Sequence, residues 1–290
     1  MKKGIGFIFR LLISLGLLVY LLKRTDFRAL KEAFLAYSPA WWLAGFGVYV
    51  AFQALSVRRW QYICRALGFD KNYPYFARLY LINMYFNTLL PGLMGGDVIR
   101  SYYLAKDGFG IKEGSFSVIL DRGAGLFGLC LILLWALPLW GDFLPLRVYT
   151  FILLSALGII LGGLVVSLAA TFRREKLLAP LRWPTSLGLF AFGFSVQILY
   201  VLQFSVMAEG LNLPVSFKDF LVIVPVTGFL SSLPITLGGL GIREASLVYF
   251  LGLRNIPQEK SLVLGFLIYS TVIIGAVPGG ILYLKGRIHD

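Results

Sequence analysis

The stretch Pro91-Gly-Leu-Met-Gly-Gly-Asp-Val-Ile-Arg100 recurs 143 residues later as Pro234-Ile-Thr-Leu-Gly-Gly-Leu-Gly-Ile-Arg243. Both copies follow the pattern P-x-x-x-G-G-x-x-I-R, in which a helix-breaking proline and a glycine pair interrupt an apolar segment and precede an arginine. Irregular backbone at membrane depth is tolerated only where protein or a water-filled cavity satisfies its polar groups. The two copies therefore predict two broken helices that face one shared site.

The composition predicts an all-α polytopic membrane protein. The 290 residues are 58% hydrophobic and the mean hydropathy is +0.80, well above the range of soluble domains. The net charge of +13 is explained by cations that flank membrane spans, and no soluble stretch is long enough to bind nucleic acid. The single histidine, His289, is next to the C-terminus, and the two cysteines lack metal-type spacing. We therefore expect no metal, no cofactor and no histidine-based catalysis.

Apolar runs bounded by charged or aromatic residues predict six spans and two further hairpins. The spans are about Ile5–Leu22, Trp41–Val57, Ser115–Trp140, Val148–Ala170, Ser186–Ala208 and Leu262–Leu284. Residues 26–40 predict an amphipathic helix in the membrane interface. Phe76–Leu104 and Phe217–Leu251 each contain one copy of the motif and predict re-entrant helical hairpins. If each hairpin crossed the membrane twice instead, the chain would make ten passes.

The offset of 143 residues also relates the spans, because it places the first on the fourth, the second on the fifth and the third on the sixth. One membrane domain, 1–290, is thus predicted to contain two homologous halves, about 1–141 and 144–284. Three crossings in each half make the repeat inverted. Sixteen Lys and Arg residues fall on the side of the N-terminus and eight on the other, which predicts cytoplasmic termini in the cytoplasmic membrane.

Arg100 and Arg243 are the first candidates for a binding site, because they follow the matched glycine breaks. Arginine presents a planar fork of donors that suits phosphate, and helix N-termini after Gly96 and Gly239 would add backbone N–H donors. A phosphate-bearing lipid headgroup fits these groups. The structural alternative is that each arginine caps carbonyls or pairs with a neighbouring acid.

Acidic residues near the motifs leave several roles open. Asp97 and Glu244 have no acidic counterpart under the offset. Each is a salt bridge that opens on phosphate binding, a proton acceptor that couples transport to a proton gradient, or a static ion pair. The pair Asp121-Arg122 either lines the same cavity or anchors the third span. Helix–helix hydrogen bonding is expected for the polar residues Asn83, Asn87, Gln197, Tyr200 and Thr236.

The strings PGLMGGDVIRSYYLA, SVILDRGAGL and SSLPITLGGLGIREASL resemble the lysylphosphatidylglycerol synthase transmembrane-region family, over nearly the whole chain. Members are associated with moving aminoacylated, hopanoid or polyprenyl-linked lipids across membranes. The resemblance places the family's characteristic positions at Gly95, Gly96, Asp97, Arg100, Asp121, Arg122, Gly238, Gly239, Arg243 and Glu244. No soluble domain that would bind an aminoacyl-tRNA follows the last span, so we expect that this chain alone does not synthesise a lysyl-lipid.

The leading hypothesis is a lipid flippase, not an enzyme, that exposes a phosphate site alternately between inverted halves. Its partners would be a membrane phospholipid or lipid-linked substrate, with a separate lipid-modifying enzyme as a further candidate. One alternative is a membrane-embedded transferase or phosphatase acting on lipid phosphates, which would need a general base or grouped metal-binding acids. Another is a non-catalytic accessory protein of an envelope-lipid pathway.

Overall fold

The computed structural model describes residues 2–89, 95–232, 236 and 239–286, with side chains for all of these except 2–8, 89 and 232. Every regular element in this part of the chain is a helix. Five helical segments are long and apolar enough to cross a membrane. They are α3 (Pro39–Ala66), α6 with the following turn η1 (Ile111–Trp140), α7 (Leu146–Thr171), α8 (Thr185–Glu209) and α11 (Gln258–Leu284). These five confirm the second to the sixth predicted spans.

The first predicted span, Ile5–Leu22, falls within α1 (Lys2–Lys23). This helix is not one of the five, and its first side chains lie outside the described residues. The predicted interfacial helix is α2 (Phe27–Leu35), which begins where the Asp26 carboxylate accepts hydrogen bonds from the backbone N–H groups of Arg28 and Ala29. Phe27 and Leu35 on α2 are exposed, as expected for a helix that lies at a membrane surface.

The helix of the second predicted span continues beyond Val57, its predicted end. Helix α3 begins after Ser38 with Pro39 in its first turn and continues to Ala66. The chain contains no glycine or proline between Val57 and Gly68, where φ is +89° and the backbone turns away. Arg58 and Arg59 are therefore inside a helix rather than in a loop.

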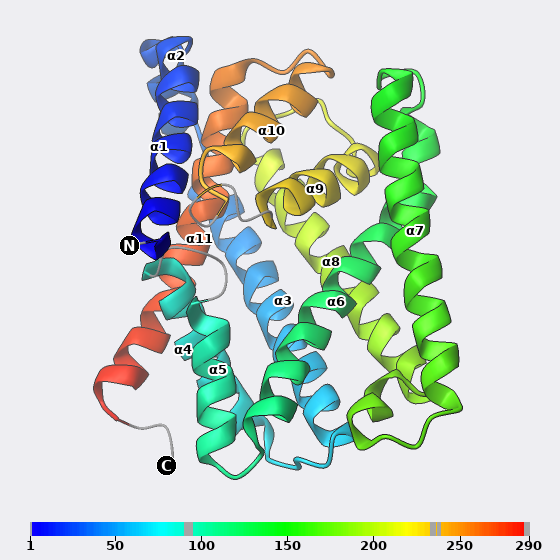
Figure 1. Cartoon of the computed structure of the whole chain (residues 1–290). Coiled ribbons are helices and arrows are strands. Elements are labelled where there is room, and N and C mark those ends of the chain that lie inside the picture. Colours follow the sequence, from blue (N-terminus) through cyan, green and yellow to red (C-terminus); the bar gives the residue numbers. More distant parts are fainter. Residues whose placement is uncertain (1, 90–94, 233–235, 237–238, 287–290) are drawn as a thin grey trace.

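The two predicted hairpins are formed by pairs of short helices. The first pair is α4 (Tyr73–Leu89) with α5 (Gly95–Lys106), and the second is α9 (Phe217–Ser232) with α10 (Ile242–Gly252). In Figure 1, α4 and α5 occupy the lower half of the molecule and α9 and α10 the upper half. Helices α5 and α10, with 12 and 11 residues, are each about 17 Å long, whereas a hydrocarbon core is about 30 Å thick. Neither helix crosses a membrane by itself. The links at residues 90–94 and 233–235 lie outside the described residues.

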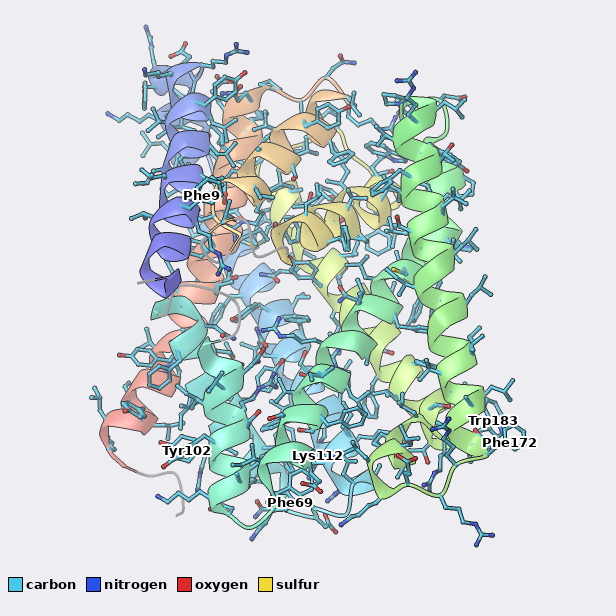
Figure 2. All side chains as sticks on the ribbon, in the orientation of Figure 1. Phe9, Phe69, Tyr102, Lys112, Phe172 and Trp183 are labelled. Carbon is cyan, nitrogen blue, oxygen red and sulfur yellow. The ribbon has the colours of Figure 1, made fainter. Side chains whose placement is uncertain are left out.

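Long helices cross at the centre of the molecule, where α3 packs on α8 and α8 on α6. Glycine allows the second crossing to be close, because a Cβ on Gly128 would lie 2.3 Å from the carbonyl carbon of Gly193. The outer surface is apolar: Phe9, Phe172 and Trp183 are exposed and stand on the outside of the bundle in Figure 2. This surface suits contact with lipid.

Candidate functional site

Five charged side chains from three helices form a continuous row of alternating sign, here called the charge row. Its members, in order of contact, are Arg59, Asp121, Arg100, Asp97 and Arg122. Arg59 on α3 donates from Nε to Asp121 Oδ1 on α6 at 2.8 Å. Arg100 on α5 bridges two acids, with Nη1 3.1 Å from Asp121 Oδ2 and Nη2 2.7 Å from Asp97 Oδ1. Arg122 on α6 completes the row by pairing with the other oxygen of Asp97.

The charge row lies part-way along the candidate span α6 and is closed at one end. The Arg100 side chain is 2% exposed, whereas that of Arg122 is 40% exposed. Arg122 lies about 17 Å along α6 from Ile111, roughly half the thickness of a hydrocarbon core. Among the described side chains, three guanidinium groups meet two carboxylates. The row thus carries one positive charge in excess, and its accessible end is a cation.

Aromatic rings hold the centre of the row in place. The Arg100 guanidinium lies 4.8 Å from the centre of the Trp60 ring and 5.0 Å from that of Tyr80. The Trp60 indole in turn donates to Ser117 Oγ at 3.1 Å. Cation–π contacts of this kind strengthen when water is excluded. These contacts fix the guanidinium between α3, α4 and α6.

The second matched arginine, Arg243, has a different environment. It pairs with Glu244, which is fully buried, and its guanidinium lies 4.8 Å from the ring centre of Tyr269 on α11. The second Glu244 oxygen, Oε2, accepts from the Gly241 N–H at 2.7 Å and so caps the start of α10. This pair is electrically neutral, in contrast to the charge row.

The structure brings four of the predicted site residues together in the charge row: Asp97, Arg100, Asp121 and Arg122. Arg243 and Glu244 form the separate pair. Each matched arginine is paired with a neighbouring acid, as the structural alternative expected, and the two pairings differ in their charge balance.

The glycines of the motif are placed only in part. Gly95 begins α5, and the Gly96 N–H, which precedes the N–H groups that were expected to face an anion, donates to Asn87 Oδ1 at 2.9 Å. Gly239 has φ of +79°, and Gly238 lies outside the described residues. The backbone donor of the first break is thus used within the hairpin.

Arg59 is the member of the row that sequence reasoning missed, because it was assigned to the flank of a span. The signal was available: without a helix breaker before Gly68, the spacing of Ser56, Arg59, Trp60 and Ile63 places all four on one face of a continuing helix. All four are buried. Gln197 was interpreted correctly as a helix–helix donor, since its Nε2 donates to the Gly125 carbonyl at 3.0 Å.

Two surface hollows lie away from both arginines. One of about 390 Å³ includes Asp219 and Arg254 in its lining, and the other, of about 340 Å³, lies between α2 and α11. Neither is lined by Arg100 or Arg243. Among the residues with described side chains, no group of three His, Cys, Asp or Glu is placed to hold a metal.

Comparison with known proteins assigns the chain to a family. Residues 7–279 match the family described as the lysylphosphatidylglycerol synthase TM region. The chain belongs to this family. It is also similar to the UPF0104 membrane protein MJ1078 of Methanocaldococcus jannaschii, with 28% identity over 220 residues that cover 67% of this chain and 92% of the relative. The family confirms the resemblance drawn from the motifs, and the chain is a helical membrane protein.

Proposed function

We propose that the protein is a lipid transporter that moves a phosphate-bearing lipid across the cytoplasmic membrane. The observation that carries the proposal is the charge row, in which two carboxylates join three guanidinium groups on and beside the candidate span α6. Intramembrane charges are costly, and those that are kept commonly mark a substrate pathway. A site with more guanidinium groups than carboxylates favours an anion. Membership of a lipid-related family makes a lipid phosphate the natural source of that anion.

The half-exposed Arg122 is the group that would receive the phosphate first. Its partner Asp97 also binds Arg100, so Asp97 keeps one cationic partner when a phosphate draws Arg122 away. A guanidinium binds two phosphate oxygens at once, which favours this exchange. The buried arginines of the row, Arg59 and Arg100, then stay in place and keep the site positively charged while Arg122 moves.

We further propose that the two halves are inverted repeats with re-entrant hairpins. Shifting α4 by 143 residues gives 216–232, and α9 is Phe217–Ser232. The contacts between helices repeat as well. In the first half α3 packs on α4 and α5 packs on α6, and in the second half α8 packs on α9 and α10 packs on α11. Contacts between the halves follow the same correspondence: α4 packs on α11, and its counterpart α9 packs on α6, the counterpart of α11. A pseudo-twofold axis in the membrane plane would account for this exchange, and both termini would be cytoplasmic.

The test is lipid movement in proteoliposomes that contain fluorescent phospholipids. Arg122→Gln removes the accessible end of the charge row, and Arg254→Gln is the matched control. Arg254 is also a partly buried arginine paired with an aspartate, Asp219, but it lies outside the row. We expect Arg122→Gln to lower the rate of lipid movement about tenfold or more, because a charge-assisted contact is worth about 1.5–3 kcal/mol. Arg254→Gln should move lipid as the wild type does.

The alternatives make different predictions in the same vesicles. Equal rates in both variants would remove the charge row from the transport path. Conversion of a lipid phosphate to a new product would show an enzyme, which the proposal excludes. If neither the wild type nor the variants move lipids with any of several headgroups, the protein is better explained as an accessory protein.

A further inference from the structure

The hollow between α2 and α11 is lined by apolar side chains and one lysine. Its volume of about 340 Å³ falls within the range of ligand pockets, about 300–1,000 Å³. The α2 residues of the lining recur at spacings of three and four and therefore share one face of the helix. The lining consists of Phe27, Leu30, Lys31, Phe34 and Leu35 on α2 and of Val263 and Phe266 on α11.

Hydrogen bonds fix the start of α2 against the first turn of α11, so the hollow is a built feature of the fold. The N–H of Asp26, which precedes α2, donates to Glu259 Oε1 at 3.1 Å. Gln258 Nε2 donates to Thr25 Oγ1 at 2.7 Å and to the Leu21 carbonyl at 2.9 Å. The two walls of the hollow are thus tied together at one end.

The α2 wall of the hollow is left uncovered by the described part of the chain. Phe27, Phe34 and Leu35 are 63%, 54% and 72% exposed. Clustered apolar side chains of this size mark a surface that contacts lipid or protein. The exposed aromatic residues Tyr20 and Trp41, which precede and follow α2, are typical of the membrane interface. The hollow therefore lies at the level where acyl chains meet headgroups.

Four cations lie on α2 or within the four residues before it: Lys23, Arg24, Arg28 and Lys31. They are half of the eight Lys and Arg residues predicted to lie away from the cytoplasm, where cations are normally scarce. Arg28 pairs with Glu32, and Arg24 lies over an aromatic ring. Lys31, which lines the hollow, makes no ion pair or hydrogen bond with the described residues. Its ammonium group is therefore available to an anion.

An anionic phospholipid matches both features of the hollow. Its acyl chain is the apolar partner that the exposed wall of α2 lacks, and its phosphate is a strong acceptor for an ammonium group. A lysine at this level can place its stem along apolar surface while its charge stays among the headgroups. The occupant is also already present, because the bilayer surrounds this face of the protein.

We propose that the hollow between α2 and α11 binds an anionic phospholipid, with one acyl chain against Phe34 and the phosphate at Lys31. The headgroup must carry net negative charge, because a zwitterionic lipid brings a cation of its own next to Lys31. Figure 1 shows α2 at the upper end of the molecule, whereas α5, which contributes Arg100 to the charge row, is in the lower half. The site is therefore separate from the charge row and does not depend on the proposed transport.

The measurement is the Tm of the purified full chain in detergent as phosphatidylglycerol is added, compared with phosphatidylcholine that has the same acyl chains. We expect phosphatidylglycerol to raise the Tm by about 3 °C or more once it is well above its Kd. Phosphatidylcholine should give less than half of this rise. Glycerol phosphate, which has the anionic group without the chains, should give none.

Lys31→Gln tests the contact with the phosphate, because it removes the charge and keeps most of the stem. Lys218→Gln is the matched control, since Lys218 is an exposed lysine on the same predicted side and outside the hollow. The phosphatidylglycerol concentration that gives half of the Tm rise should increase about fivefold or more in Lys31→Gln. It should not change in Lys218→Gln.

Phe34→Ala tests the contact with the chain, and Phe151→Ala, at an exposed position on α7, is its control. We expect Phe34→Ala to weaken binding of phosphatidylglycerol about threefold or more, because apolar contact area is lost. Equal Tm rises with both lipids, or a rise with glycerol phosphate alone, would overturn the site. So would identical phosphatidylglycerol curves for Lys31→Gln and Lys218→Gln.

Discussion

The first hairpin depends on the absence of a side chain at Gly96, and this gives a quantitative prediction. A Cβ at this position would lie 2.2 Å from the backbone oxygen of Asn83 and 2.4 Å from its side-chain Oδ1. The backbone oxygen of Asn83 cannot rotate away. Helix α5 must therefore move from α4 by about 1 Å to bring the contact close to an ordinary distance of about 3.5 Å. Overpacking of this kind costs about 1–3 kcal/mol.

The same movement would also disturb the charge row. Asp97 follows Gly96 directly, and Arg100 is on the same helix, one turn further along. A shift of about 1 Å is enough to break the 3.1 Å contact between Arg100 Nη1 and Asp121 Oδ2, because hydrogen bonds are lost beyond about 3.5 Å. Gly96→Ala should therefore lower both the stability of the fold and the rate of lipid movement.

The assay is thermal unfolding in detergent, followed by the proteoliposome measurement. The control is Gly123→Ala on α6, where a new Cβ has no atom within 4 Å. At about 2–4 °C per kcal/mol for a large domain, we expect the Tm of Gly96→Ala to fall by about 3–10 °C. Gly123→Ala should match or slightly exceed the wild type, since alanine is the better helix former. A Tm for Gly96→Ala within about 1 °C of this control would refute the reasoning.

Three other predictions concern ion pairs. Arg59→Gln should destabilise the protein by about 1.5–3 kcal/mol because it removes a charge-assisted hydrogen bond to the buried Asp121, which still keeps Arg100, whereas Arg58→Gln, at the exposed neighbouring position, should cost about 1 kcal/mol or less. Glu244→Gln should lower the Tm by leaving Arg243 buried without a counter-charge, and the double variant Arg243→Met/Glu244→Gln should recover part of the loss. Asp219→Asn should lower the Tm at pH 7, and this loss should shrink as the pH falls below 3.8.

The pH prediction follows from the surroundings of Asp219, which lies in the first turn of α9, outside the five spans. Burial alone would raise the pKa of this carboxyl, but hydrogen bonds from Arg254 and Ser216 outweigh it and hold the pKa below the ordinary value of 3.8. A depressed pKa stabilises the fold above the unfolded value of 3.8, and this contribution is lost as pH falls through the folded pKa. The Tm gap between wild type and Asp219→Asn should therefore close on acidification.

Each of these ion-pair predictions has a clear contrary result. Equal unfolding of the Arg58 and Arg59 variants would mean that burial does not separate the two arginines. A double variant no more stable than Glu244→Gln alone would show that the Glu244 cap on α10, rather than the charge of Arg243, dominates. A Tm gap at Asp219 that stays constant from pH 7 to pH 3 would contradict the depressed pKa.

The sequence by itself determined the helical membrane class, the five spans that the structure confirms and the positions of both pairs of short helices. These features are local: apolar runs, interfacial aromatic residues and helix breakers act within one or two turns of their own position. For the same reason the pair Asp97 and Arg100, three residues apart on one helix, could be anticipated.

Only the tertiary structure decided how the charges are shared. Arg59 meets Asp121 across 62 residues, Asn87 accepts a hydrogen bond from the N–H of Gly96, and Gln197 donates to the carbonyl of Gly125 on another helix. These contacts depend on the distance at which helices pack, and glycines such as Gly96 and Gly128 allow a close approach. The excess positive charge of the row is a sum over three helices, and no single stretch of the chain contains it.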